Sequence, residues 1–213
     1  LKRMYEKDED VLYYITLYNE NYPMAPKPEG VDEGILRGLY RYKRGEGKGP
    51  RVQILGSGPI LLQALRAQEI LAADYGVSAD VWSATSYQQL RNDALSVERW
   101  NRLHPTDPPQ RSYVAEALAE VNRPIVAVTD FVKTVPDQIA RWVPQPFIPL
   151  GTDGFGRSDT RAALRSYFET DAAHLCVAVL GQLCADGAVD ASIVTDAITR
   201  FGVDPELPVP WHG

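Results

Sequence analysis

Val52-Gln53-Ile54-Leu55-Gly56-Ser57-Gly58-Pro59 opens the part of the chain whose pattern decides the fold. The apolar run 52–55 predicts a buried strand, and Pro59 suits the first turn of a helix, where its missing N–H costs nothing. Apolar residues then recur at helical spacing from Ile60 to Leu71. The stretch therefore predicts a strand followed directly by a helix, which is the repeating unit of an α/β fold.

Three more strand-like segments follow this unit. Residues 80–84 and 125–128 predict buried strands, and 147–150 predicts a peripheral one because Pro149 cannot donate to a strand ladder. Helices are expected over 86–103, 112–121, 130–142, 160–169, 172–185 and 191–201. Strands that alternate with helices predict a mainly parallel sheet covered on both faces, a three-layer α/β/α domain.

Several helix starts carry capping residues. Ser86 with Gln89 predicts a capping box, in which each side chain satisfies a backbone N–H near the other residue. Asp130 and Asp190 are expected to cap two later helices, and Ser158 or Asp159 the helix that begins near 160. Local chemistry therefore places most helix starts.

The first fifty residues have a different pattern. The apolar run within 11–18 predicts a buried strand, the prolines of 22–28 break regular structure, and 29–40 fits a short helix. Residues 43–50 have the composition of a linker. We therefore expect residues 1–42 to end one domain and 51–213 to form the next. A strand with no sheet before it leads us to expect a fragment of a longer protein.

Composition limits the classes of function. The 213 residues carry a net charge of −6, which argues against a general nucleic-acid binder and favours a basic partner if the partner is charged. No apolar run approaches the ~20 residues that cross a membrane, so we expect a soluble protein. Cys176 and Cys184 are predicted to share one helix too far apart to pair, and such sparse cysteine use fits the cytoplasm.

The most distinctive loop is 150–159, with three glycines between a predicted strand and a predicted helix. Its charged residues Asp153 and Arg157 could pair and hold the loop in shape, or they could contact a ligand, since loops at strand ends often bind one. We favour the structural use. The tight turn Gly56-Ser57-Gly58 resembles a dinucleotide fingerprint, but the third glycine would fall at Leu61. A structural turn is favoured there, and a small anion at the helix N-terminus stays an alternative.

The histidines give no catalytic signal. His104 lies in a proline-rich loop, His174 at the start of a predicted buried helix, and His212 in the tail. None has a Ser, Cys or Asp at a spacing that suggests a triad. We therefore name no catalytic residue from the histidine pattern.

Read together, the glycine loop, Asn19-Glu20-Asn21-Tyr22, Glu98-Arg99-Trp100-Asn101 and His104-Pro105 carry a resemblance. From about Met4 to Val203 the chain resembles the C-terminal part of the homodimeric, thiamine-diphosphate-dependent pyruvate dehydrogenases of the transketolase superfamily. The resemblance implies the last strand and tail of a pyrimidine-binding domain, followed by a complete C-terminal domain.

The resemblance also implies a function for the full-length protein. Such an enzyme decarboxylates pyruvate with thiamine diphosphate and Mg²⁺ and passes the acetyl group to lipoyl groups of a dihydrolipoyl acyltransferase core. The cofactor and the catalytic groups would lie on other parts of the enzyme, so this segment would supply scaffold and contacts with a second copy of the subunit.

The resemblance places candidate residues at a channel mouth or an interface, namely Asn19, Glu20, Asn21, Asp153 and Arg157. Transketolases have an arginine near the position of Asn19 that contacts a sugar phosphate, and this chain has none there. That difference fits an unphosphorylated 2-oxo acid. Asparagines that satisfy backbone groups in a turn remain an equal alternative at Asn19 and Asn21.

Two other classes of function stay open. One is a free-standing α/β domain that binds a small or regulatory molecule at Gly56-Ser57-Gly58. The other is an interaction module without a ligand.

Overall fold

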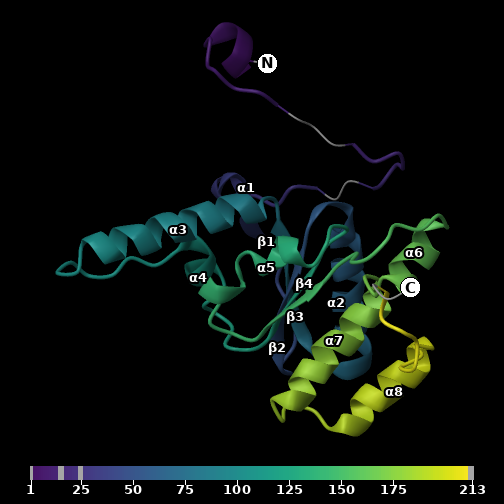
Figure 1. Cartoon of the computed structure of the whole chain (residues 1–213). Helices are drawn as coiled ribbons and strands as arrows, with labels where there is room; N and C mark the ends of the chain where they lie inside the picture. Colours follow the sequence, from purple (N-terminus) through teal and green to yellow (C-terminus); the bar gives the residue numbers. More distant parts are fainter. Residues whose placement is uncertain (1, 14–16, 24–25, 211–213) are drawn as a thin grey trace.

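A single five-stranded sheet forms the centre of the protein (Figure 1). The computed structural model describes residues 2–13, 17–23 and 26–210. The strand order is β1-β3-β2-β4-β5, with β1 antiparallel to β3 and every other neighbouring pair parallel. The strands are β1 (Leu39–Lys43), β2 (Arg51–Gly56), β3 (Ser78–Ala84), β4 (Ile125–Val128) and β5 (Phe147–Leu150). The expected mainly parallel sheet is confirmed.

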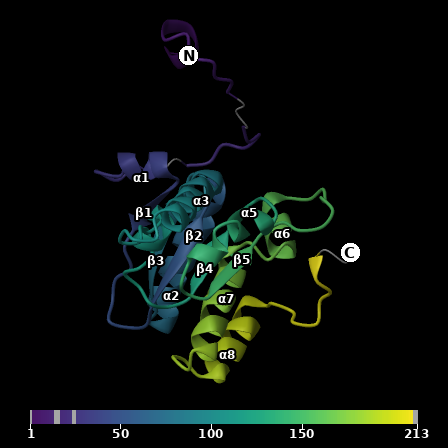
Figure 2. The same ribbon diagram turned by 60° about the vertical axis from the view of Figure 1, so that its left-hand side comes forward.

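Helices cover both faces of this sheet, which confirms the three-layer α/β/α architecture (Figures 1 and 2). The α-helices are α1 (Asp32–Arg37), α2 (Leu61–Tyr75), α3 (Tyr87–Leu103), α4 (Tyr113–Ala117), α5 (Thr134–Asp137), α6 (Arg161–Tyr167), α7 (Ala172–Ala185) and α8 (Ala191–Phe201). The helices α2 and α7 lie on one face and α3 and α4 on the other, while α8 packs against α7. No helix within the described ranges is long and apolar enough to cross a membrane.

The sheet separates two hydrophobic cores. Along β2, Val52 and Ile54 belong to the core under α2 and α7, whereas Leu55 belongs to the core under α3 and α4. This alternation follows from the period of two along a strand, which sends successive side chains to opposite faces. On α2 the predicted apolar face is confirmed, since Ile60, Ala64, Ala67 and Leu71 are fully buried.

The first strand of the sheet begins in the last two residues of the helix predicted over 29–40 and ends at the start of the predicted linker. The helix expected over 29–40 is limited to α1 because Gly38 adopts a left-handed conformation, with φ +101°, and ends it. Leu39 then begins β1 and is fully buried. The sheet therefore starts before the loop at 44–50. The division of the chain into 1–42 and 51–213 stays a prediction.

The buried strand expected over 11–18 is not found in the part that the structure describes. Residues 11–13 and 17–18 have no regular structure, and Leu12 and Leu17 are 90% and 88% exposed. Residues 14–16 lie outside the described residues. A strand needs a neighbour for its backbone groups, and none of the described strands pairs with this segment. Figure 2 shows residues 2–13 lying away from the α/β body.

Two predicted helices are shorter than expected. The helix predicted over 112–121 is reduced to α4, and the one predicted over 130–142 to α5 and a short turn at Ala140–Trp142. Pro136 lies within α5, and a proline restricts the helical conformation of the residue before it. Because α5 begins at Thr134, with Lys133 at its N-cap, Asp130 is too far from it to act as a cap.

The capping predictions are partly confirmed. Ser86 Oγ accepts a hydrogen bond from Gln89 N at 3.2 Å, but Ser86 N donates to Gly38 O instead of to the Gln89 side chain. Thr160, not Ser158 or Asp159, caps α6. Asp190 stands at the N-cap of α8 without a side-chain hydrogen bond to the helix.

Candidate functional site

The carboxyl ends of the parallel strands meet at one edge of the sheet. In the sheet, β2 lies between β3 and β4. The chain adds β3 on one side of β2 and then β4 on the other side, so the direction of strand addition reverses between β2 and β4. Ser57 Oγ and Thr129 Oγ1, just past these two strands, are 2.8 Å apart and hydrogen-bonded. Open α/β sheets bind their ligands at such a switch point. We call the residues around it the carboxyl edge.

Tyr18, from the segment that precedes the sheet, lies beside this switch point. Its hydroxyl lies 3.5 Å from Asp130 Oδ2 and would lie 3.6 Å from a Cβ atom placed on Gly58. Gly58 has φ +58°, a conformation that favours glycine. The Tyr18 hydroxyl therefore lies beside the turn that resembled a dinucleotide fingerprint.

The predicted site residues Asn19 and Glu20 contact α6. Arg161 donates from Nε to Glu20 Oε2 at 3.2 Å and from Nη2 to Asn19 Oδ1 at 3.3 Å. Tyr22 completes the contact, because its hydroxyl donates to Glu20 Oε2 at 3.0 Å and accepts from Arg165 Nη2 at 3.4 Å. The segment 18–22 is thus joined to the carboxyl edge at Asp130 and at α6.

Asp130 is the acid at the centre of this arrangement. Burial raises its pKa above the ordinary aspartate value, and the charges of Arg165 and Arg161 and the hydrogen bond from Tyr18 act in the opposite direction. The pKa of Tyr18 is also raised, by burial first and by the charge of Asp130 second. These two groups therefore hold their protons more strongly than they would in water.

Two cavities border the contact between the segment and the sheet. A small one of about 90 Å³ is lined by Asp130, Thr152, Arg161, Leu164, Arg165, Phe168 and Thr170. A larger one of about 840 Å³ lies between residues 17–23, the start of α2 and the end of β3, and Asn21 is among its lining residues. The site residues that sequence reasoning missed are Asp130, Arg161 and Arg165. The only local signal for the arginines is their spacing of four on one helix.

Asp153 and Arg157 do not pair with each other, so the expected ion pair is wrong. Asp153 Oδ1 accepts a hydrogen bond from Lys133 N at 2.9 Å, and the guanidinium of Arg157 stacks 4.2 Å from the ring centre of Tyr167. Each residue holds the loop to a different neighbour. The structural use of the glycine loop thus rests on separate contacts.

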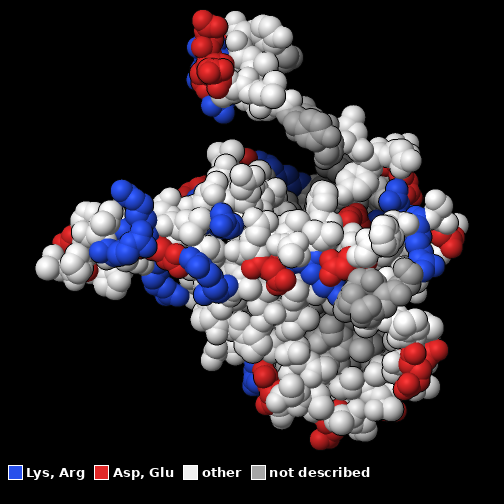
Figure 3. Space-filling model, viewed as in Figure 1, with Lys and Arg blue, Asp and Glu red and all other residues white. Residues whose placement is uncertain are grey.

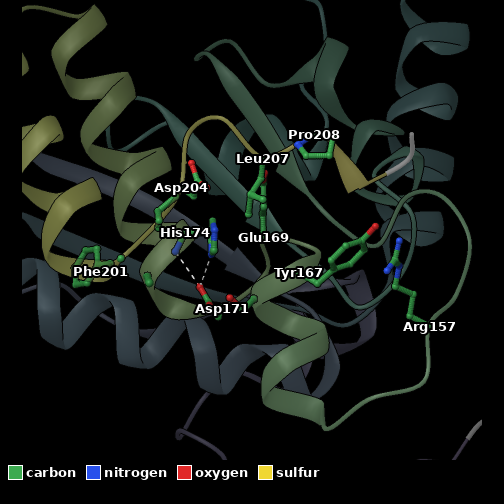
Figure 4. Close-up of a pocket in the computed structure, with 13 residues that line it drawn as sticks. Arg157, Tyr167, Glu169, Asp171, His174, Phe201, Asp204, Leu207 and Pro208 are labelled. Atoms are coloured by element: carbon green, nitrogen blue, oxygen red, sulfur yellow. Dashed lines mark hydrogen bonds and ion pairs between the residues drawn. The ribbon is translucent and has the colours of Figure 1, made fainter. Parts of the chain in front are cut away.

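A third cavity, of about 290 Å³, lies where α6, α7 and the chain after α8 meet (Figure 4). Asp171 caps α7 there, accepting from His174 N at 2.9 Å, and its Oδ1 also lies 2.8 Å from His174 Nδ1. Burial opposes ionisation of Asp171, but these hydrogen bonds outweigh it and lower its pKa. The histidine therefore has an acid partner that its spacing alone did not reveal. Asp171 thereby satisfies a backbone N–H in the first turn of α7.

Basic side chains are also frequent on one of the long helices. Figure 3 shows Lys and Arg concentrated over α3, with acidic side chains among them. Across the described ranges no three His, Cys, Asp or Glu side chains are grouped as metal ligands.

Comparisons with known proteins identify relatives along nearly the whole chain. The family model of the transketolase-like TK C-terminal domain matches residues 38–171. The pyruvate dehydrogenase E1 component of Escherichia coli (strain K12) is 48% identical over 212 residues, which cover 99% of this chain and 24% of that protein. The E1 component of Mycobacterium tuberculosis is 45% identical over 207 residues, covering 96% and 22%. The chain thus spans about a quarter of the length of the relatives it matches.

Solved structures with a similar arrangement are transketolases. The transketolase from Leishmania mexicana has a TM-score of 0.48 and 18% identity, covering 76% of this chain and 21% of that one. A split gene transketolase, described as an inactive beta4 tetramer, has a TM-score of 0.48 and 19% identity, covering 69% and 42%.

Proposed function

This chain belongs to the transketolase-like TK C-terminal domain family, and from that premise we propose that it is the C-terminal part of a pyruvate dehydrogenase E1 component. The observation that carries the proposal is the match to E1 components over 99% of the chain. Domain families of this kind host many activities, so the family alone names no substrate. The long match to E1 components supports pyruvate as the substrate of the complete enzyme.

The complete enzyme would decarboxylate pyruvate and transfer the acetyl group to a lipoyl group of a dihydrolipoyl acyltransferase core. Thiamine diphosphate, bound with Mg²⁺, would stabilise the carbanion that decarboxylation leaves. The chain spans about a quarter of the length of the E1 components it matches, which leaves most of such an enzyme to hold the cofactor. We therefore assign cofactor binding and catalysis to other parts of the enzyme.

This chain would contribute scaffold and contacts with a second copy of the subunit. The loops after β4 and β5 present Phe131 and Phe155, which are 54% and 85% exposed. Exposed aromatic side chains on neighbouring loops are typical of surfaces that a partner covers. The net charge of −6 favours a basic surface on a further partner such as the acyltransferase core, and free cysteines fit the cytoplasm.

The predicted channel-mouth or interface residues fit this proposal in different ways. Asn19 and Glu20 fix the preceding segment to α6, and Asn21 borders the larger cavity. Asp153 and Arg157 hold the loop after β5. We propose that the first three lie where this domain meets the preceding one, and that the last two shape an interface.

A chimeric enzyme tests the proposal. The corresponding quarter of the E. coli E1 component would be replaced by this chain, and acetyl transfer from pyruvate to a lipoyl domain would be measured. We expect activity well above that of the E. coli protein truncated before this segment. Activity no higher than that of the truncated protein, in a chimera that folds and assembles, would contradict the assignment.

The isolated chain offers a second test. Calorimetry with thiamine diphosphate and Mg²⁺ should detect no binding, because the residues that would hold them are expected elsewhere. A micromolar dissociation constant would instead support a free-standing binding domain, which is the first rival class.

A further inference from the structure

The second half of α3 projects from the α/β body, together with the loop that follows it (Figure 1). The buried residues of this helix are Tyr87, Leu90 and Ala94, which all lie in its first half. The helix nevertheless continues to Leu103, and no residue from 95 to 111 belongs to either hydrophobic core. We call residues 95–111 the projecting arm. Because the arm does not serve the cores, its ordered shape requires another explanation.

Specific contacts hold the projecting arm in one shape. The Asn101 side chain exchanges two hydrogen bonds with the backbone of Gln110, at 3.0 and 2.8 Å, and so fastens the loop to the helix. The His104 ring stacks on the Trp100 ring, with the ring centres 4.4 Å apart. Ordering a chain segment costs conformational entropy. A surface that is already ordered avoids that cost when it binds a partner.

One exposed face of α3 alternates basic and apolar side chains. Four side chains follow one another at a spacing of four and so form one row along the helix, namely Arg91, Leu95, Arg99 and Leu103. Arg102, three positions after Arg99, lies beside this row. The three arginines are exposed, and Leu103 is 53% exposed. We call these five residues the arginine stripe.

The arginine stripe has no acidic partner within the described part of the chain. None of its three guanidiniums forms an ion pair with a described carboxylate, and the two acids of α3 are engaged elsewhere. Asp93 accepts a hydrogen bond from Tyr113 N at 2.7 Å. Glu98 accepts from Trp142 Nε1 at 2.8 Å and from Arg141. The positive charge of the stripe is therefore left to solvent or to another molecule.

An acidic partner would relieve a repulsion within the stripe. Arg99 and Arg102 are three apart and so are neighbours on the helix surface, where like charges repel. The helix dipole favours Arg102, which lies in the last turn. It gives no such support to Arg91, which lies in the first half of the helix. The structure of this chain alone thus explains one of the three arginines.

We propose that the arginine stripe binds an acidic helix of a partner protein, in which carboxylates and apolar side chains alternate at the same spacing of four. From Arg91 to Arg102 the stripe extends about 16 Å, or about three helical turns, which suits a weak and reversible contact. The net charge of −6 favours a basic partner for the chain as a whole. Close to the stripe the arginines dominate, because salt screens the more distant charges. The proposal does not depend on the function proposed above.

Titration of a fluorescent peptide with the 213-residue chain tests the proposal. The peptide has about 20 residues, long enough to form a helix on its own, with glutamate and leucine alternating every four residues along one face. Fluorescence anisotropy should show saturable binding that weakens as salt screens the ion pairs. A peptide of the same composition in scrambled order should bind several-fold more weakly, because its charges and apolar groups do not match the row.

Variants of the stripe assign the binding to its residues. A triple variant with Arg91→Gln, Arg99→Gln and Arg102→Gln should bind about tenfold more weakly, because each exposed ion pair contributes modestly and three are lost together. Lysine at the same three positions keeps the charge and should retain most of the affinity. Leu103→Ser keeps all three arginines and should weaken binding of the alternating peptide more than that of the scrambled one.

A second triple variant is the matched control. Arg66→Gln, Arg123→Gln and Arg200→Gln remove the same charge from exposed positions outside α3 and should leave peptide binding unchanged. Thermal melts followed by circular dichroism should show the stripe variant no less stable than the parent chain, because removing like charges relieves repulsion. Its weaker binding would then not result from unfolding.

Several outcomes would overturn the proposal. Equal binding by the two triple variants would show that only the overall charge matters, and equal binding of the scrambled peptide would remove the match of spacing. Tighter binding of single-stranded RNA or of phosphatidylserine vesicles would assign the stripe to a different class of partner. Salt-sensitive self-association in sedimentation, lost in the stripe variant, would assign it to a second copy of this chain.

Discussion

An aspartate lies at each of the two edges of the sheet, and the two aspartates differ in how many hydrogen-bond partners they have. At the amino edge, Asp80 on β3 is 0% exposed and accepts hydrogen bonds from Arg51 Nη2 at 2.8 Å, Arg41 Nη1 at 3.2 Å and Gly45 N at 2.8 Å. At the carboxyl edge, Asp130 has a tyrosine hydroxyl at 3.5 Å and no guanidinium within 4.0 Å in the described ranges. The first acid is fully satisfied, and the second is not.

Glu120 extends the network at the amino edge. It accepts from Arg41 at 2.6 Å, from Arg44 at 2.5 Å and from Arg51 at 3.3 Å, which ties β1 and the loop after it to the start of β2. The side-chain hydrogen bond from Arg41 lowers its pKa. Satisfied charges of this kind fix the geometry of a fold. The contrast suggests that the amino edge serves structure and that the carboxyl edge is available for binding.

The largest effect should come from removing the satisfied acid. Asp80→Ala removes the buried acceptor of the Arg41 and Arg51 guanidiniums, which keep only Glu120, and leaves the Gly45 amide without its acceptor. Breaking a buried ion pair costs about 3–5 kcal/mol, and we expect about 3 kcal/mol because both arginines are partly exposed and regain some hydration. Urea denaturation followed by circular dichroism measures the change in the free energy of unfolding. Asp130→Ala is the matched control and should cost far less; equal losses would remove the contrast between the edges.

The second effect concerns the backbone at the carboxyl edge. A Cβ on Gly151 would lie 2.5 Å from Phe131 O, so Gly151→Ala should lower the free energy of unfolding by about 2 kcal/mol, as overpacking does. Gly154 has φ +92°, and Gly154→Ala should cost about 1 kcal/mol. Gly156 has open space, so Gly156→Ala and Asp153→Asn should cost less than either. Melting temperatures give the order, and a Gly156 variant less stable than the Gly151 variant would show that the loop is shaped otherwise.

The third effect concerns the direction in which two amide variants, Asp130→Asn and Glu120→Gln, change the free energy of unfolding. Because the pKa of Asp130 is raised, the stability that Asp130 contributes to the folded state is present below the ordinary aspartate pKa. This stability is lost as the pH rises through the raised pKa. Asp130→Asn should therefore be more stable than the parent chain at pH 7, with the difference vanishing near pH 3. The lowered pKa of Glu120 gives the reverse, so Glu120→Gln should be less stable at pH 7 and equal at low pH.

Urea midpoints between pH 3 and pH 8 measure both curves. Each change should stay within about 1 kcal/mol, since Glu120 is largely exposed and its pairs are screened. If both variants change stability in the same direction at pH 7, the folded protein would favour the ionised form of Asp130 as it does that of Glu120, and the contrast between the edges would be wrong.

The smallest effect should follow Tyr18→Phe. Removing a hydroxyl 3.5 Å from Asp130 should change stability by less than about 0.5 kcal/mol. It should raise the pKa of Asp130 further, because that hydrogen bond favours the ionised carboxylate. Carboxyl carbon shifts in NMR titrations would report the pKa. Tyr22→Phe should leave it nearly unchanged, and an unaltered Asp130 pKa in the Tyr18 variant would place the contact outside the site.

The sequence alone predicted the elements whose signals are local. The strands at 52–55, 80–84 and 125–128 and the helices over 172–185 and 191–201 follow from apolar periodicity and end residues, and the structure confirms them. Periodicity suffices there because each element buries a whole face against the sheet or a neighbouring helix. The parallel order of the sheet followed from the alternation of strands and helices.

Only the tertiary structure decided what lies at the sheet's edges. The helix predicted over 29–40 includes only the first two residues of β1 (Leu39–Lys43), and this stretch becomes a strand because β3 offers a free edge beside the turn at Gly38. Tyr18 and Asp130 are separated by 112 positions, and Glu20 and Arg161 by 141. Contacts across such separations leave no periodic or spacing signal in the chain, since they form only when the strands are already in place. The candidate site therefore depends on the assembled sheet, whereas the strands and helices that support it could be predicted from local sequence patterns.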